Sequence, residues 1–142
     1  MLKKTTVLLL AFCFTLPLQA DDRIKADFPD MMRDHMLANM RDHLTALQEI
    51  TASLASGKYD HAADVAEARL GMSSLELHGA AHLSKVMPKE MAAIGTAMHH
   101  AASRFALTAR DADIEGGLGK AFGALSEVMQ QCVNCHSAYR AH

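Results

Sequence analysis

Residues 30–57 read DMMRDHMLANMRDHLTALQEITASLASG, and the spacing of their side chains predicts one long amphipathic helix. The positions expected to face inward recur at alternating intervals of four and three residues, which puts them on one side of a helix. They are Met36, Met40, His43, Leu47, Ile50 and Leu54. Asp27 and Asp30, on either side of Phe28-Pro29, predict an N-terminal cap with Pro in the first turn. Gly57 predicts the end of the helix.

The chain beyond this helix predicts further helices and no strand. A second helical stretch is expected from about Asp60 to Met87, distorted near residues 71–74, and Pro88 suits the start of a third. The inward positions of the third are Met91, Ile94, Met98, Ala101 and Phe105. Residues 111–119 lack an apolar face and are expected to form a loop.

The last stretch has one apolar face too, formed by Leu118, Phe122, Leu125, Met129, Cys132 and His136. Four amphipathic helices joined by short connections predict an all-α fold, an antiparallel four-helix bundle. The length of 142 residues suits a single domain of this kind.

The first twenty residues have the pattern of a secretory signal peptide. A cationic start containing Lys3 and Lys4 precedes an apolar run from Val7 to Phe14, and a small residue, Ala20, precedes two acidic ones. The apolar run is far shorter than the ~20 residues that span a bilayer. We therefore expect residues 1–20 to be removed after about Ala20. Residues 21–142 would then form a periplasmic domain without a membrane anchor.

The charge of residues 21–142 argues against nucleic acid as a partner. They contain 12 Lys and Arg against 16 Asp and Glu, so they carry no basic surface for phosphates. Their only cysteines are Cys132 and Cys135. In an exported protein such a pair usually indicates a disulfide, but the residue after Cys135 points to different chemistry.

Residues 132–136 read CVNCH, the C-x-x-C-H pattern of covalent haem attachment. On a helix, residues three and four apart share a side, so Cys132, Cys135 and His136 converge. Two thiols can bond to the two vinyl groups of a haem while the imidazole of His136 binds the iron. The alternatives are a redox-active C-x-x-C pair, which usually begins a helix beside a strand, and part of a zinc site, which needs further ligands.

With this motif in its last helix, the chain resembles the cytochrome c prime family. The resemblance covers residues 21–142, and its specific part is the segment CVNCHSAYR at residues 132–140. It implies a periplasmic four-helix bundle, one haem c held by Cys132 and Cys135, and His136 as the proximal iron ligand. It also implies a homodimer through the first two helices in many members, and a basic residue, here Arg140, at the haem edge.

The sixth iron position decides between two functions that the resemblance implies. Members with a methionine ligand from the first helix resemble electron carriers, and members with a vacant or apolar distal side resemble binders of nitric oxide and other small gases. Met40 and Met36 lie one turn apart on the same helix face, so their spacing does not choose between them. His43 on that face is expected to be a buried core residue, with iron ligation as the alternative.

A copper-handling haem protein is a further alternative. His78 and His82 are four residues apart in the second helical stretch, a spacing that lets two imidazoles bind one metal ion. No nucleophile, carboxylate pair or phosphate-binding loop indicates an enzyme. The sequence therefore predicts single-electron transfer with periplasmic redox proteins as partners, and nitric oxide binding as the main alternative.

Overall fold

A computed structural model describes residues 21–115 and 117–142, so the expected signal peptide lies outside the described residues. The described chain is mostly helical, as predicted, and no described helix has the length and apolarity needed to cross a membrane. Its elements are β1 (Ile24–Lys25), α1 (Asp30–Ala55), α2 (Tyr59–Arg69), the 3-10 helix η1 (Met72–Ser74), α3 (Ala80–Leu83), α4 (Lys89–Glu115), α5 (Leu118–Ala138) and β2 (Tyr139–Arg140).

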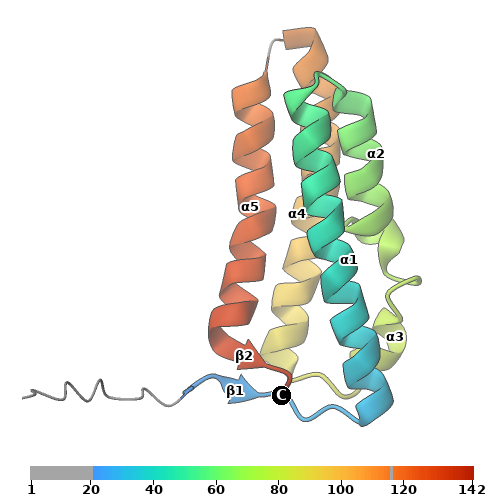
Figure 1. Cartoon of the computed structure of the whole chain (residues 1–142), viewed down its shortest axis with the longest axis vertical. Coiled ribbons are helices and arrows are strands. Elements are labelled where there is room, and N and C mark those ends of the chain that lie inside the picture. Colours follow the sequence, from blue (N-terminus) through green and yellow to red (C-terminus); the bar gives the residue numbers. More distant parts are fainter. Residues whose placement is uncertain (1–20, 116) are drawn as a thin grey trace, which may run out of the picture.

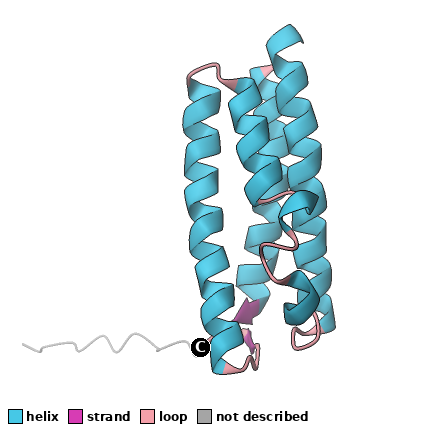
Figure 2. Cartoon of the chain, turned by 90° about the vertical axis from the view of Figure 1, so that its right-hand side faces the viewer, coloured by secondary structure: helices cyan, strands magenta, loops and turns pink. Residues whose placement is uncertain are grey.

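The four longer helices run lengthwise beside one another and alternate in direction (Figure 1). α1 packs on α2, α2 packs on α4, and α4 packs most extensively on α5. Within residues 21–115 and 117–142, no comparable packing joins α5 to α1. The molecule is therefore least closed along the side between its first and last helices. Figure 2 shows the short helices and their loops on the opposite side, below α2.

Two apolar clusters fill the interior. The larger one contains small side chains from α2 and α4 around Ile50, Leu54 and Phe105. The smaller one lies toward the end where β1 pairs with β2, and it includes Met36 and Met91. Because alanines dominate the larger cluster, the helices approach one another closely there, and apolar burial supplies most of the stabilisation.

α1 buries the face that its sequence predicts. Met36, His43, Ile50 and Leu54 are buried, and Met40 and Leu47 are partly buried against the same clusters. Arg69 joins α2 to α1, because it bonds the carboxylates of Asp42 and Glu49 together. The predicted acidic cap is wrong: Pro29 occupies the N-cap position, and no side chain caps the backbone N–H groups of the first turn.

The second helical stretch is broken rather than distorted. α2 ends at Arg69, and turns separate it from the single-turn helix α3. Gly71 explains the break, since a Cβ there would lie 2.8 Å from the Cα of Glu67, and only glycine permits so close a turn. α3 then begins after Gly79, which has a φ of +64°.

The predicted loop at residues 111–119 is also wrong in part, because α4 continues to Glu115. Ala112 is buried and extends the inward row of Phe105 and Ala109, so the helix still has a surface to bury. An alanine contributes little to an apolar pattern in the sequence, which is why this last turn is missed. The chain reverses at Gly117, whose N–H donates to the carbonyl of Ala112 over 2.9 Å.

α5 turns a different face inward from the one its sequence predicts. Ala121, Leu125 and Val128 are buried, whereas four larger apolar side chains are exposed. These are Leu118, Phe122, Met129 and Val133. Because α4 presents alanines to α5, the two helices lie close together, and the side chains between them are alanine or branched. The bulkier side chains of α5 face outward. The predicted row is therefore correct at Leu125 and Cys132 and wrong at Leu118, Phe122, Met129 and His136.

Candidate functional site

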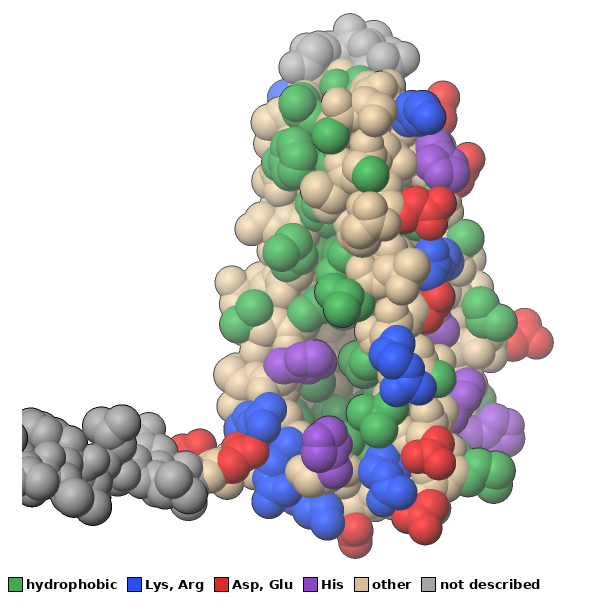
Figure 3. All heavy atoms as spheres, in the orientation of Figure 1, with side chains coloured by type: hydrophobic (Ala, Val, Ile, Leu, Met, Phe, Trp, Pro, Cys, Tyr) green, Lys and Arg blue, Asp and Glu red, His purple; other side chains and the backbone are tan. Residues whose placement is uncertain are grey.

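A cavity of about 520 Å³ lies between α1, α4 and the end of α5. Figure 3 shows the molecular surface hollowed in this region, with hydrophobic side chains around the depression. The volume lies within the ~300–1,000 Å³ typical of ligand and cofactor sites. Five methionines contribute to its wall: Met36, Met40, Met87, Met91 and Met98.

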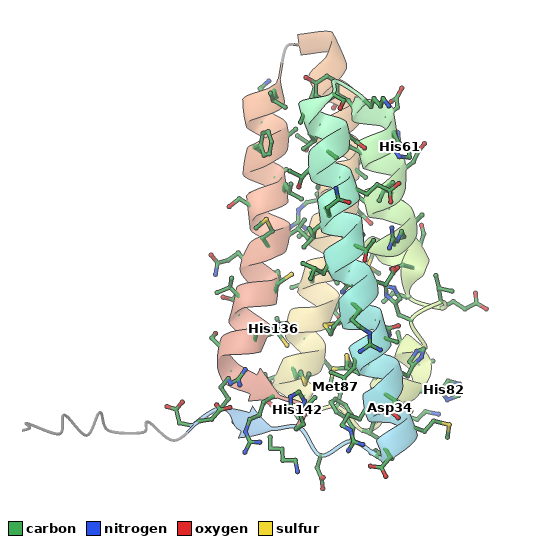
Figure 4. All side chains as sticks on the ribbon, viewed as in Figure 1. Asp34, His61, His82, Met87, His136 and His142 are labelled. Carbon is green, nitrogen blue, oxygen red and sulfur yellow. The ribbon has the colours of Figure 1, made fainter. Side chains whose placement is uncertain are left out.

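The C-x-x-C-H motif occupies the last turns of α5, beside this cavity. Cys135 and His136 line the cavity directly. Cys132 lies one turn earlier, half-buried, with its Sγ 3.7 Å from the carbonyl of Val128. His136 is exposed on the lower part of α5 (Figure 4). The two cysteines are free thiols.

The two thiols are poor candidates for redox exchange. Burial raises the pKa of Cys132 and of Cys135, so both stay protonated near neutral pH. Redox-active C-x-x-C pairs depend on the opposite shift, which the N-terminus of a helix helps to produce. This pair lies at the C-terminal end of α5. Its electrostatic environment therefore disfavours the redox alternative.

The surroundings also disfavour a zinc site at the motif. In the described segments, no set of three or more His, Cys, Asp or Glu side chains has its donor atoms arranged around a common metal position. A structural zinc ion normally requires four such ligands. The motif thus lacks the partners that a metal-thiolate centre would need.

A c-type haem suits the residues that surround the cavity. The motif supplies two neutral thiols and one imidazole on consecutive helical turns, and the facing wall is apolar. Gly95 of α4 lines the cavity, and a Cβ at this position would meet no other heavy atom within 4 Å. The part of the cavity beside Gly95 is therefore open enough for a large planar ligand.

Comparison with known proteins gives no match to this chain, whether to a protein-family model, a curated protein or a solved structure. Any proposal about function therefore depends on the cavity and the side chains around it.

Both candidate sixth ligands reach the cavity from α1. Met36 is buried and Met40 is partly buried, and both pack in the apolar cluster that includes Met91. The structure thus brings the two predicted methionines to the wall opposite α5. It also brings Met87, which precedes α4, and Met91, in the first turn of α4, to the cavity.

Positive side chains gather at the lower end of the cavity, where the two ends of the described chain meet. β1 pairs with β2 in parallel, with Ile24 opposite Tyr139. This pairing brings Arg23 beside the motif, where its Nη1 donates to the carbonyl of His136 over 3.2 Å. The predicted haem-edge residue Arg140 lines the same region and lies 3.7 Å from the carboxylate of Asp21.

Arg23 is a site residue that the sequence did not reveal. Two residues of strand give no recognisable alternation, and the partner strand is at the other end of the chain. The only available signal was the resemblance at Arg140, which says nothing about residues near the N-terminus.

The predicted pairing of His78 with His82 is wrong. His78 lies in the turns before α3 and is buried, while His82 belongs to α3 itself and is exposed (Figure 4). The two would share a side only on a continuous helix, and the break after Arg69 removes that helix. His43 and His99 instead lie next to His78, from α1 and α4.

Proposed function

We propose that this chain is a c-type cytochrome that binds one haem covalently in the cavity between α1, α4 and α5. The observation that supports this most is the position of the motif: two neutral thiols and His136 at the edge of an apolar cavity large enough for a cofactor. We propose in the same sense that the four long helices form an antiparallel four-helix bundle of the cytochrome c prime kind.

Each side chain then has a definite role. Cys132 and Cys135 hold the haem through thioether bonds, and the imidazole of His136 binds the iron. Arg23 and Arg140 supply positive charge at the cavity's lower end, where the haem carboxylates would compete for them with Asp21, which already bonds Arg23 over 2.7 and 2.8 Å. The bound haem supplies an iron that cycles between the ferric and ferrous states.

Single-electron transfer is the function that the methionine-rich wall supports best. A thioether ligand from Met36 or Met40 stabilises the ferrous state and raises the reduction potential, which suits an electron carrier. The protein would exchange electrons with other periplasmic proteins, as a monomer or a homodimer. If neither methionine binds the iron, the same apolar wall suits reversible binding of nitric oxide.

The visible spectrum of the protein, exported together with haem-attachment machinery, tests this proposal. We expect sharp low-spin α and β bands after reduction with dithionite, and a weak thioether-to-iron band at the red end of the oxidised spectrum. A broad high-spin spectrum that changes at once with nitric oxide would favour gas binding. Absence of covalently bound haem after denaturation would contradict both functions.

A further inference from the structure

Three buried histidines meet inside the molecule, on elements other than α5. His43 comes from α1, His78 from the turns before α3, and His99 from α4. Their ring centroids are 4.7 Å apart for His43 and His78, 5.5 Å for His78 and His99, and 6.3 Å for His43 and His99. Their exposed fractions are 8%, 5% and 8% respectively, so water does not solvate them freely.

Two of these three rings have no hydrogen-bond partner at Nε2. Nδ1 of His99 donates to the carbonyl of Leu70 over 2.7 Å, which leaves its Nε2 as the acceptor nitrogen. Nδ1 of His78 lies 3.4 Å from the hydroxyl oxygen of Ser74. Nε2 of His78 and Nε2 of His43 are buried without any hydrogen-bond partner. A buried polar nitrogen without a partner destabilises the folded chain, and a bound ion would supply that partner.

The electrostatics keep the three imidazoles neutral. Burial lowers the pKa of His43 to about 4, and the neighbouring rings of His78 and His99 contribute to this shift. Burial is also the main cause of the lowered pKa values of His78 and His99. A neutral imidazole has a lone pair on one ring nitrogen, which is the form that binds a metal ion.

We propose that His43, His78 and His99 bind one transition-metal ion, copper or zinc, through their Nε2 atoms. An Nδ1 bonded to a carbonyl and a free Nε2 are the arrangement by which proteins orient histidine ligands, and His99 has it. This site is distinct from the proposed haem ligand His136, and it does not depend on haem being bound.

The spacing of the rings suits such an ion. With metal–nitrogen distances of about 2.0–2.1 Å and tetrahedral angles, the centroids of three imidazole ligands are about 5 Å apart. The observed separations of 4.7–6.3 Å lie on both sides of that value. The donor atoms do not converge on one point in the described chain, so the rings must turn about their side-chain bonds when the ion binds.

The surroundings indicate which metals the site would take. All three rings line the methionine-rich cavity, and neither lysine nor arginine is among the residues of the wall on α1 or α4. Imidazole suits both zinc and copper, and nearby thioethers such as Met40 and Met98 favour copper in its cuprous state. A fourth ligand would reach the ion from the cavity.

Metal analysis of the purified, haem-loaded protein tests the site. The protein is dialysed against buffered zinc chloride in one arm and against cuprous ion under a reductant in the other. We expect one equivalent retained per chain in at least one arm. His43→Leu, His78→Leu and His99→Leu should each weaken retention by at least about 100-fold, because a lost ligand costs more than the 10–100-fold of a lost supporting group.

A variant with three exposed histidines replaced, H61Q/H82Q/H100Q, is the matched control and should retain the ion. Retention by the three leucine variants, or no retention by the unmodified protein in either arm, would overturn the proposal. So would a haem spectrum that loses a ligand on His43→Leu alone, because His43 would then bind the iron.

A second measurement covers the case in which a leucine variant does not fold. In the unmodified protein with labelled histidine, the ion should shift the nitrogen resonances of three rings and leave the exposed histidines unchanged. Shifts confined to exposed histidines would also overturn the proposal. Haem content is measured separately, so failure of this site and failure of the proposed haem attachment can be told apart.

Discussion

Met36 and Met40 lie one helical turn apart, and both reach the cavity, so a substitution must choose between them. Leucine has nearly the volume of methionine but no sulfur, so stability should change by less than about 1.5 kcal/mol. We expect one of Met36→Leu and Met40→Leu to abolish the low-spin spectrum and lower the reduction potential. Met31→Leu is the control, because Met31 is 80% exposed. Unchanged spectra in both variants would rule out iron ligation by Met36 and by Met40.

Gly95 tests whether the open space above α4 is the cofactor's place. We expect Gly95→Leu to reduce covalently bound haem strongly while far-UV circular dichroism still reports full helicity, because leucine favours a helix and its side chain would project into the cavity. Gly123→Leu, on the exposed side of α5, should load haem normally. Equal haem content in the two variants would show that the cavity beside Gly95 is not used.

At the residue scale, the sequence predicted some of the residues that line the cavity and missed others. The attachment motif is recognisable because its three members are close together in the sequence, and the candidates Met36 and Met40 follow from helix periodicity. His99 could not be paired with His43 and His78 in the same way. These three lie on separate elements, and only packing reveals their proximity.

Two glycines, one at a helix end and one inside a helix, offer a test at this scale, because replacing them with alanine should change the stability in opposite directions. Gly57 ends α1 with a φ of +69°, a conformation that costs other residues roughly 1–2 kcal/mol. Gly123 lies within α5, and a methyl group added to it would meet no other heavy atom within 4 Å, so alanine should gain roughly 0.5–1 kcal/mol there. Urea denaturation should therefore show Gly57→Ala less stable and Gly123→Ala more stable than the parent. The same sign for both would contradict these assignments.

The sequence predicted elements well where large side chains mark the buried face. α1 and α4 bury the rows that their spacing indicates, from Met36 to Leu54 and from Met91 to Phe105. The face that α5 buries differs from the predicted one, because α5 packs in the larger cluster through Ala121 and Val128. Small residues produce close packing without a strong apolar pattern, so the exposed row of Phe122 and Met129 resembled a buried one.

The whole molecule depends on its alanine-rich core, and Phe105 is the largest side chain completely buried in it. We expect Phe105→Ala to lower the free energy of unfolding by about 3–5 kcal/mol, through lost burial and the cavity that remains. Leu107, two residues away and 64% exposed, provides the control. Leu107→Ala should change stability by no more than about 0.5 kcal/mol. Similar losses in the two variants would mean that the core lies elsewhere.

For the whole molecule, the sequence predicted the helical fold but not the pairing of β1 with β2. The β1–β2 pair is two residues long on each side, and its members are at opposite ends of the described chain. Neither segment has the length or alternation of a recognisable strand. Tertiary packing alone brings Arg23 to the motif.

The contact between Arg23 and His136 also has a consequence for timing. These residues are 113 positions apart, and contacts between such distant positions form late, because the closing of a long loop costs entropy before the contact repays it. A chain synthesised from its N-terminus cannot make this contact until its last residues have emerged. The lower end of the cavity should therefore be the final part to assemble. If the proposed function is correct, Cys132 and Cys135 would be accessible for haem attachment until then, and the pairing of β1 with β2 would afterwards close the lower end of the cavity.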